Sequence, residues 1–540
     1  MNLLKTAATV SGFTFLSRIT GLVREVLTAS LFGAGAQTDA FFVAFRLPNL
    51  LRRLFAEGAF SQAFVPVLGQ VKAQDGEEPA RLLASRVGLG LFMSLAGITL
   101  LAILAAPALV WLMTGGFSGD TTRFELTVAL TQVMFPYIVL ISMVALASGI
   151  LNTWSEFKIP AFTPVLLNLS FIGCAVFLAP QLHEPIWALA IAVILGGLAQ
   201  LGLQAWALAR RGLLADLPHL LRNPFQSLGQ TWKDERVRRI LTLMLPASLA
   251  VSVAQVSLVI NTHIASRLAE GSVSWLSFAD RLMEFPTALL GVALGTVLLP
   301  SLTKAHNMND PARVSQLIDW GLRLVLLLAL PAALGLAVLA PALTAGLFHY
   351  GAFDLEDLNM TAYAMQGYAI GLLGLIAVKV LAPGFYAQQD IKTPVKIALA
   401  TLVLTQLLNL VFVPLMGHAG LAVATSLAAC FNAGLLLVRL RQRGTYRPEP
   451  GWGKLILKCL LAALVMAGLL AWLNQPLNWG AEQARPLLRL GMLFGLIGLA
   501  VASYFASLRL LGLPIRGMMR PPSLDEPPKP RPPNEGSSAP

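Results

Sequence analysis

The sequence predicts an all-α polytopic membrane protein. Of its 540 residues, 56% are hydrophobic and 12% are charged, and the mean hydropathy is +0.71. So few polar residues do not cover the surface of a soluble domain. Apolar stretches of about 20 residues, the length that crosses a hydrocarbon core, recur along the whole chain. Their hydrophobicity is continuous rather than alternating, which excludes an outer-membrane β-barrel.

Taken in chain order, these stretches give fourteen predicted membrane spans. The first is interpreted as an uncleaved span rather than a signal peptide, because Arg18 interrupts its apolar run and no small-residue cleavage site follows. A tail rich in Pro, Ser, Glu and Lys follows the last span and is predicted to be disordered. The predicted spans are 5–30, 39–69, 86–112, 124–151, 161–179, 186–208, 239–265, 275–303, 315–344, 359–387, 395–414, 419–438, 455–473 and 486–508.

The net charge of +12 is distributed unevenly between alternate loops. Lys and Arg gather on one side, whereas the loop 349–358 carries three acidic residues and no Lys or Arg. The positive-inside rule therefore predicts both termini in the cytoplasm. The concentration of Lys and Arg in the loops on one side of the membrane also accounts for the positive net charge, so no nucleic acid partner is expected. The two most basic loops hold Arg210, Arg211, Arg222, Lys233, Arg236, Arg238 and Arg239, and Arg439, Arg441, Arg443 and Arg447.

The chain repeats itself at an offset of 234 residues, which indicates an internal duplication. An even number of six spans per repeat makes both halves enter the membrane in the same direction, related by a pseudo-twofold axis along the membrane normal. A pair of lobes around a central site is typical of a secondary transporter. The matching pairs are Ala106–Leu109 with Ala340–Leu343, Pro66 with Pro300, and Glu156–Pro160 with Asp390–Pro394.

The repeat also sets the predicted domain organisation. Spans thirteen and fourteen have no counterpart in the first half and are interpreted as an appendage. The predicted parts are an N-terminal lobe (1–215), a basic cytoplasmic loop (216–236), a C-terminal lobe (237–443), the two additional spans (444–511) and a disordered cytoplasmic tail (512–540).

The first two spans carry charges at membrane depth. Each such charge costs a few kcal/mol or more, so it persists only where it faces protein, water or a charged substrate. Arg18 and Arg52 each lie about 20 Å along their helices, well inside the hydrocarbon region. The first span holds Ser17, Arg18, Arg24 and Glu25, and the second holds Asp39, Arg46, Asn49, Arg52, Arg53 and Glu57.

Spacing groups these residues further. Arg46, Asn49, Arg53 and Glu57 fall on one helical stripe, with Arg52 beside it. The eighth span adds Arg281 and Glu284, one turn apart, from the second repeat. Cationic residues from both lobes are therefore predicted to line one central cavity.

Arginine is informative here because its guanidinium stays charged when buried and offers a planar fork to phosphate oxygens. Three or four such groups suggest a ligand of charge about −2, such as a pyrophosphate. The alternative is that three ion pairs neutralise one another in a packed core, namely Arg18–Glu25, Arg53–Glu57 and Arg281–Glu284. That alternative leaves Arg24 and Arg52 unpaired, and Arg46 also if Asp39 lies elsewhere.

Catalytic and metal-binding motifs are not found. Cys174, Cys430 and Cys459 all fall inside apolar spans without CxxC or Cys/His spacing, so neither a disulfide nor a metal is predicted. There is no Ser/His/Asp set, Walker sequence or DDxxD cluster. The protein is accordingly predicted not to be an enzyme and to use no cofactor.

The charged motifs also carry a family resemblance. The runs Ser17–Glu25, Thr38–Phe41 and Arg46–Phe60 closely resemble the start of the bacterial MurJ (MviN) family, and Ala279–Pro286 resembles its eighth span. The resemblance implies a fourteen-helix member of the multidrug/oligosaccharidyl-lipid/polysaccharide (MOP) exporter superfamily. It also implies a lipid II flippase, which moves the undecaprenyl-pyrophosphate-linked peptidoglycan precursor between the leaflets of the bacterial inner membrane.

By position, the resemblance assigns substrate binding to Arg18, Arg24, Arg52 and Arg281. It assigns supporting roles to Asp39, Asn49, Glu57 and Glu284, to which spacing adds Ser17, Glu25 and Arg53. The last two spans would resemble the family's lateral groove for the prenyl tail. Some relatives bind sodium through carboxylates in spans seven and eleven, but 241–265 and 395–415 contain no Asp or Glu here, so that site is not predicted.

Expected partners are lipid II, membrane lipids and possible contacts with the cell-wall synthesis machinery, with the protein acting as a monomer. The closest alternative is an exporter of another polyprenyl-pyrophosphate-linked glycan. Three other functional classes make different predictions. A drug/cation antiporter would favour acidic cavity residues, and an enzyme acting on lipid pyrophosphates would need catalytic carboxylates or a metal cluster. A scaffold that does not transport would tolerate loss of the buried charges.

Overall fold

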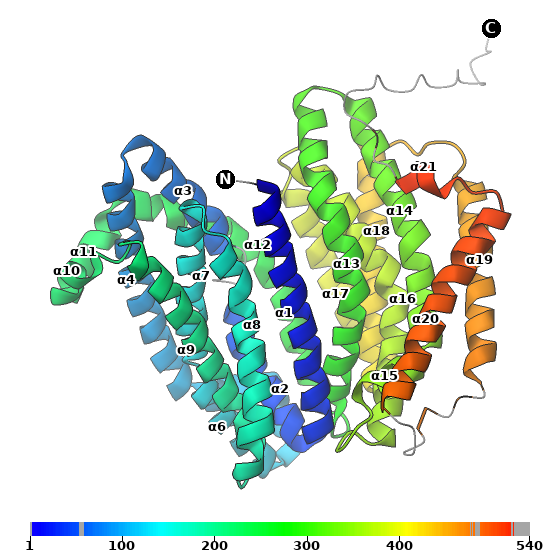
Figure 1. Ribbon diagram of the computed structural model, residues 1–540, viewed down its shortest axis with the longest axis horizontal. Helices are drawn as coiled ribbons and strands as arrows, with labels where there is room; N and C mark the ends of the chain where they lie inside the picture. Colours follow the sequence, from blue (N-terminus) through cyan, green and yellow to red (C-terminus); the bar gives the residue numbers. More distant parts are fainter. Residues whose placement is uncertain are drawn as a thin grey trace. The chain divides into compact units, whose positions relative to one another are not determined.

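A computed structural model describes residues 3–52, 59–475, 477, 479–480, 486–519 and 522. Throughout this part of the chain the regular structure is helical, and no strand is present (Figure 1). The predicted all-α class is therefore confirmed. The helices group into two compact units, one formed by residues 1–278 and 347–359 and the other by 279–346 and 360–540.

The first half of the chain supplies α1 to α9 of the first unit. Breaks divide several predicted spans: the third comprises α4 and α5, and the fourth comprises α6 and α7. The bounds are α1 Leu3–Phe32, α2 Ala36–Arg52, α3 Ala59–Gln74, α4 Glu77–Leu104, α5 Ala106–Thr114, α6 Thr121–Met134, α7 Tyr137–Thr153, α8 Lys158–Gly173 and α9 Trp187–Arg210.

Two short helices, α10 (Leu217–Arg222) and α11 (Pro224–Lys233), connect α9 to α12. The remaining helices include α15, which separates from α14 and so divides the predicted ninth span. Their bounds are α12 Glu235–Ala265, α13 Ser272–Asn307, α14 Pro311–Val338, α15 Ala340–Phe348, α16 Leu355–Tyr386, α17 Lys392–Met416, α18 His418–Gln442, α19 Trp452–Asn474, α20 Pro486–Leu510 and α21 Ile515–Met519.

Ten helical segments of the described chain are long and apolar enough to cross a membrane, which makes this a multi-pass membrane protein. The predicted first, second, seventh and eighth spans correspond to α1, α2 with α3, α12 and α13, and fall outside these ten. Residues 53–58, inside the predicted second span, lie outside the described part. The count of fourteen spans stays a prediction.

Helix boundaries reproduce the predicted repeat. Each of four helices in the first half begins exactly 234 positions before one in the second half. The turn before α8 and the turn before α17 also share a residue with positive φ, Ser155 (61°) and Gln389 (58°), again 234 apart. The corresponding starts are Glu77 and Pro311, Ala106 and Ala340, Thr121 and Leu355, and Lys158 and Lys392.

The repeated Ala-Pro-Ala-Leu sequence explains the breaks at Ala105 and Leu339. In each half the proline is the second residue of a nine-residue helix, α5 or α15. Proline fits the first turn because that position has no intrahelical acceptor to lose, whereas deeper in a helix it removes a hydrogen bond. The single spans predicted over 86–112 and 315–344 were therefore wrong in detail, because each is two helices.

An ion pair is duplicated as well. Glu156 in the turn before α8 pairs with Arg211 at 2.6 Å, and Asp390 in the turn before α17 pairs with Arg443 at 2.5 Å. Asp390 also accepts hydrogen bonds from the amide and hydroxyl of Thr393. Burial raises the pKa of this carboxyl, but the bonds from Thr393 and Arg443 outweigh it and lower the pKa to about 2.

Apolar clusters hold the first unit together. One joins α3, α4 and α7 to the start of α12 and includes Phe64, Leu83 and Ile240. A second joins α2, α6, α7, α8 and α9 and includes Phe41 and Tyr137. The α2 segment and the start of α12 are thus fixed by packing on several neighbours, which positions their polar residues.

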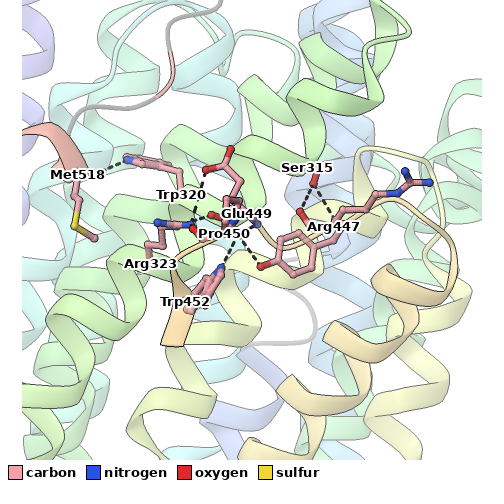
Figure 2. A network of polar contacts seen from close by, with 10 residues as sticks. Ser315, Trp320, Arg323, Arg447, Glu449, Pro450, Trp452 and Met518 are labelled. Atoms are coloured by element: carbon pink, nitrogen blue, oxygen red, sulfur yellow. Dashed lines mark hydrogen bonds and ion pairs between the residues drawn. The ribbon is translucent and has the colours of Figure 1, made fainter. Parts of the chain in front are cut away.

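In the second unit, a polar network around Asp319 fastens the segment 446–452 to α14 (Figure 2). This carboxylate is 1% exposed and accepts hydrogen bonds from the Tyr446 hydroxyl, the Glu449 amide and the Trp452 indole, at 2.9, 3.2 and 2.8 Å. Arg323 completes it with an ion pair to Asp319 and a hydrogen bond to the carbonyl oxygen of Pro450.

Helix α14 makes further hydrogen bonds to the C-terminal part of the chain. The Ser315 hydroxyl exchanges hydrogen bonds with the backbone of Arg447, and the Trp320 indole donates to the carbonyl oxygen of Met518 (Figure 2). Deeper along α14, the carbonyl oxygen of Leu327 accepts from the Tyr504 hydroxyl of α20 at 2.8 Å. The appendage is thus an integral part of the second unit.

Candidate functional site

The most developed cationic site of the first unit lies between α1 and α8. Arg24 Nη2 pairs with Glu25 Oε1 at 2.5 Å, and Arg24 Nη1 donates to Asn168 Oδ1 at 3.2 Å. The guanidinium carbon lies 5.1 Å from the centre of the Phe171 ring, a cation–π distance. These contacts hold the Arg24 fork in one orientation although its side chain keeps 16% exposure.

Asn168 is the link between the two helices. Its Nδ2 donates to the carbonyl oxygen of Ser17 at 3.0 Å and to the Thr20 hydroxyl at 3.1 Å, while its Oδ1 accepts from Arg24. Gly21 faces this amide, since a Cβ there would stand 3.5 Å from Asn168 Nδ2. One side chain therefore satisfies polar groups along two turns of α1, including the arginine.

Arg18 lies on α1 six residues before Arg24. It is exposed and forms no ion pair with another described residue. Two guanidinium groups and the Glu25 carboxylate leave one net positive charge on this part of α1. Ser17, expected to support the site, contributes its backbone carbonyl to Asn168.

The alternative pairing expected for this helix is wrong. Glu25 pairs with Arg24 and not with Arg18, so Arg24 is not left unpaired. Seven residues separate Arg18 from Glu25, about 10 Å along the helix axis, whereas Arg24 reaches the neighbouring carboxylate directly.

Arg46 of α2 is held by hydroxyl groups. Its Nη1 donates to Thr262 Oγ1 of α12 at 2.5 Å and its Nη2 to Ser277 Oγ of α13 at 3.1 Å. Both hydroxyls in turn donate to carbonyl oxygens one turn back, those of Leu258 and Val273. These two acceptors orient the guanidinium of Arg46 toward α12 and α13.

Asp39, expected to support the cavity, lies in a buried polar cluster with Arg123. The carboxylate is 0% exposed and pairs with Arg123 Nη2 at 2.5 Å. It also accepts from the Gly271 amide at 3.0 Å, the Ser274 amide at 2.8 Å and the Ser274 hydroxyl. Phe117 covers the other side of the arginine, 4.1 Å from its guanidinium carbon. The acceptors of Asp39 are thus fully used inside the first unit.

In the second unit, Arg281 and Glu284 of α13 pair at 2.8 Å, which is one of the three ion pairs of the alternative in which these charges neutralise one another. Both remain about half exposed, 49% and 51% of their side-chain surfaces. An exposed pair of this kind is weak, so the guanidinium can exchange its carboxylate for another anion.

The remaining predicted site residues are only partly described. Arg52 ends α2, but its side chain is not described, and Arg53 and Glu57 lie outside the described residues. Asn49 lies on α2, half-buried, in the register that the polar stripe predicted. The convergence of Arg18, Arg24 and Arg52 with Arg281 stays a prediction.

Sequence reasoning missed Asn168, Arg123 and Asp357. The first two had a signal: Asn168 is a polar residue within the apolar span 161–179, and Arg123 immediately precedes the span 124–151. Asp357, in the acidic loop, accepts from the Trp275 indole at 2.8 Å and the Ala34 amide at 3.0 Å, so it fixes that loop onto the first unit. Among the described residues, no group of His, Cys, Asp and Glu is arranged to hold a metal ion.

Comparison with known proteins decides the family. The family model described as lipid II flippase MurJ matches residues 28–487. A Burkholderia cenocepacia protein named lipid II flippase MurJ is 52% identical over 95% of this chain and 98% of its own length. This chain belongs to the MurJ family. A Vibrio cholerae relative is 42% identical over 96% of this chain and 97% of its own length.

Solved structures agree at the level of the fold. A structure titled lipid II flippase MurJ, inward closed conformation, superposes with a TM-score of 0.74 at 24% identity, covering 95% of this chain and 99% of that one. An inward-facing MATE multidrug transporter of the MOP superfamily superposes with a TM-score of 0.67 at 14% identity, covering 81% of this chain and 98% of that one. The family expected from the charged motifs is confirmed, and the chain shares its fold with both of these solved structures.

Proposed function

We propose that this protein is a lipid II flippase that moves the lipid-linked peptidoglycan precursor from the inner to the outer leaflet of the bacterial inner membrane. The proposal is supported by the 52% identity, over nearly the full length of both chains, to a protein of that name. The geometry that suits it best is the oriented Arg24 fork on α1 with the exposed Arg18 two turns away.

The chemistry of the head group fits these residues. A guanidinium has five N–H donors in a planar fork that matches phosphate oxygens. Arg24 uses Nη1 for Asn168 and Nη2 for Glu25, which orients the group and leaves further donors for a diphosphate. Arg18, Arg52 and Arg281 add the charge that a dianion requires, with Ser17, Glu25, Asp39, Asn49, Arg53, Glu57 and Glu284 as supporting residues.

Transport then follows from alternating access. The arginines bind the diphosphate from the cytoplasmic side while the prenyl tail stays in the membrane, next to the pair α19 and α20. Substrate moves a conformational equilibrium only through a difference in affinity between the two states. Arginines that contact the diphosphate in one state and exchange it for carboxylates such as Glu25 and Glu284 in the other supply that difference.

The topology and partners complete the proposal. Both termini and the basic loops lie in the cytoplasm, and the protein works as a monomer without a catalytic residue or cofactor. Its partners are lipid II and the surrounding lipids, with the cell-wall synthesis machinery acting on the product.

The test is the accessibility of lipid II in the outer leaflet after acute depletion of the protein in cells. Re-expression of the unmodified chain restores labelling of external lipid II, whereas Arg24→Ala does not. Losing hydrogen bonds from a charged donor costs about 1.5–3 kcal/mol each, so binding falls roughly 10- to 150-fold. Arg24→Lys retains the charge without the fork and is expected to restore only part of the activity.

Arg441→Ala serves as the matched control, because this exposed arginine lies in the last turn of α18 and is not one of the predicted site residues. Protein levels of all variants are measured by immunoblotting. Full restoration by Arg24→Ala at normal abundance would overturn the role of this arginine. Normal external lipid II after depletion of the protein would overturn the proposed function itself.

A further inference from the structure

The connection between α9 and α12 is fastened to α4 at both of its ends. Asp216, immediately before α10, pairs with Arg81 at 2.7 Å, and Asp234, immediately after α11, pairs with Arg86 at 3.0 Å. Both arginines are on α4. The segment 216–236, predicted as a basic cytoplasmic loop, thus contains two short helices that are held at both ends.

The face that α11 turns toward α4 is small and polar. Ser227 and Thr231 are buried one turn apart, and their hydroxyls donate to the carbonyl oxygens of Leu220 and Ser227. Gly90 of α4 permits the approach, because a Cβ there would lie 3.3 Å from the Thr231 methyl group. The bulky Trp232 is left on the outside, 50% exposed. In a water-facing helix, a tryptophan would be the residue to bury.

The charged residues between positions 217 and 233 are all positive. No Asp or Glu occurs between 217 and 233, and the two flanking aspartates are already engaged by α4. Arg222 and Lys233 are exposed and form no ion pair with any other residue that the structure describes. Nearby in sequence, Trp206 is 55% exposed with the Arg210 guanidinium 5.5 Å from its ring. Each of these two exposed tryptophans therefore lies beside a cation, Trp232 next to Lys233 in sequence and Trp206 next to Arg210.

We propose that this α10–α11 surface, formed by Arg222, Trp232 and Lys233, binds the headgroups of anionic phospholipids in the cytoplasmic leaflet. Tryptophan at headgroup level and basic residues beside it are the combination that favours an anionic membrane surface. The two aspartates that flank these helices pair with arginines of α4, which leaves the outer face of α10 and α11 cationic.

The test uses the full-length protein in mixed micelles titrated with phosphatidylglycerol or, separately, phosphatidylcholine, each carrying brominated acyl chains that quench nearby tryptophan. The signal of Trp232 is the difference between the unmodified chain and Trp232→Phe. We expect phosphatidylglycerol to quench it at lower concentration than phosphatidylcholine. Each basic residue at an anionic surface contributes about fivefold, so Arg222→Gln with Lys233→Gln reduces this preference by up to about 30-fold at low salt.

The matched control removes the same charge from the predicted cytoplasmic side of the other half. Lys392→Gln with Arg441→Gln takes away two exposed cations there and is expected to leave quenching of Trp232 unchanged. An equal loss in both double variants would show that only overall charge matters, and would overturn the proposal. Quenching without a preference for phosphatidylglycerol, or binding of an acidic peptide in its place, would overturn it as well. None of these outcomes depends on flippase activity, so the proposed function is tested separately.

Discussion

Replacing Arg123 by glutamine removes the ionic partner of a carboxylate that water does not reach. Asp39 is fully buried, and Arg123 supplies one of its four hydrogen bonds and all of its neutralising charge. Removing one member of a buried ion pair costs about 3–5 kcal/mol. Because Gly271 and Ser274 still donate three hydrogen bonds, we place the loss at the lower limit, about 3 kcal/mol.

The assay is heat denaturation of the purified protein in detergent, with the folded fraction measured by fluorescence-detected size exclusion. Arg211→Gln is the matched control, because its ion pair with Glu156 leaves the arginine 41% exposed. An exposed pair contributes about 0–1 kcal/mol, so this control is expected to denature close to the unmodified chain. The double variant Asp39→Asn with Arg123→Gln is expected to recover part of the loss, since it no longer buries an isolated charge. Equal midpoints for Arg123→Gln and Arg211→Gln would refute the reasoning.

Three other predictions follow from local geometry. The pKa of Asp390 is lowered to about 2, so its contribution to stability is complete above its ordinary pKa near 4 and disappears as the pH falls toward 2. In denaturation measured as a function of pH, Asp390→Asn should therefore lose less stability between about pH 4 and 2 than the unmodified chain. Gly374→Ala would place a Cβ 2.6 Å from the Cys430 amide nitrogen, so this variant is expected to lose about 1–3 kcal/mol of the free energy of unfolding. Gly434 has open space around it, so Gly434→Ala is expected to keep a thermal midpoint close to that of the unmodified chain. Asp319→Ala leaves the donors of Arg323, Tyr446 and Trp452 without their acceptor, so amide hydrogen exchange over 446–452 should accelerate while exchange in α8 stays unchanged.

The sequence predicted most of the helices because membrane spans depend on length and local hydrophobicity. Helix ends were harder: Ala105 and Leu339 interrupt runs that stay apolar throughout, so hydropathy gives no sign of the break. The repeated Ala-Pro-Ala-Leu sequence was recognised as evidence of duplication, yet its proline also marks where α5 and α15 begin. The proline thus marked the start of each helix in the sequence, but it was interpreted only as evidence of the repeat.

Side-chain partners on the same helix can be predicted from spacing, whereas partners on different helices cannot. The Arg281–Glu284 pair, which the alternative of neutralised charges contained, could be read from the sequence because both residues lie on one helix, one turn apart. The partners of Arg24 and Asp39 depend on tertiary packing: Asn168 is 144 residues from Arg24, and Arg123 is 84 residues from Asp39. Spacing along a single helix cannot specify which distant helix supplies the second member of a pair. It also cannot predict that the Arg46 guanidinium donates to hydroxyl groups of α12 and α13.

The network around Asp319 limits where the chain can be shortened. Ending it before Tyr446 would strip three donors from a carboxylate that is 1% exposed and would open the surface of α14 that α19 and α20 cover. A minimal twelve-span version would therefore carry a new water-accessible defect in its second unit. Tags and fusion partners are better attached beyond Met519, where the last contact with Trp320 has already been made.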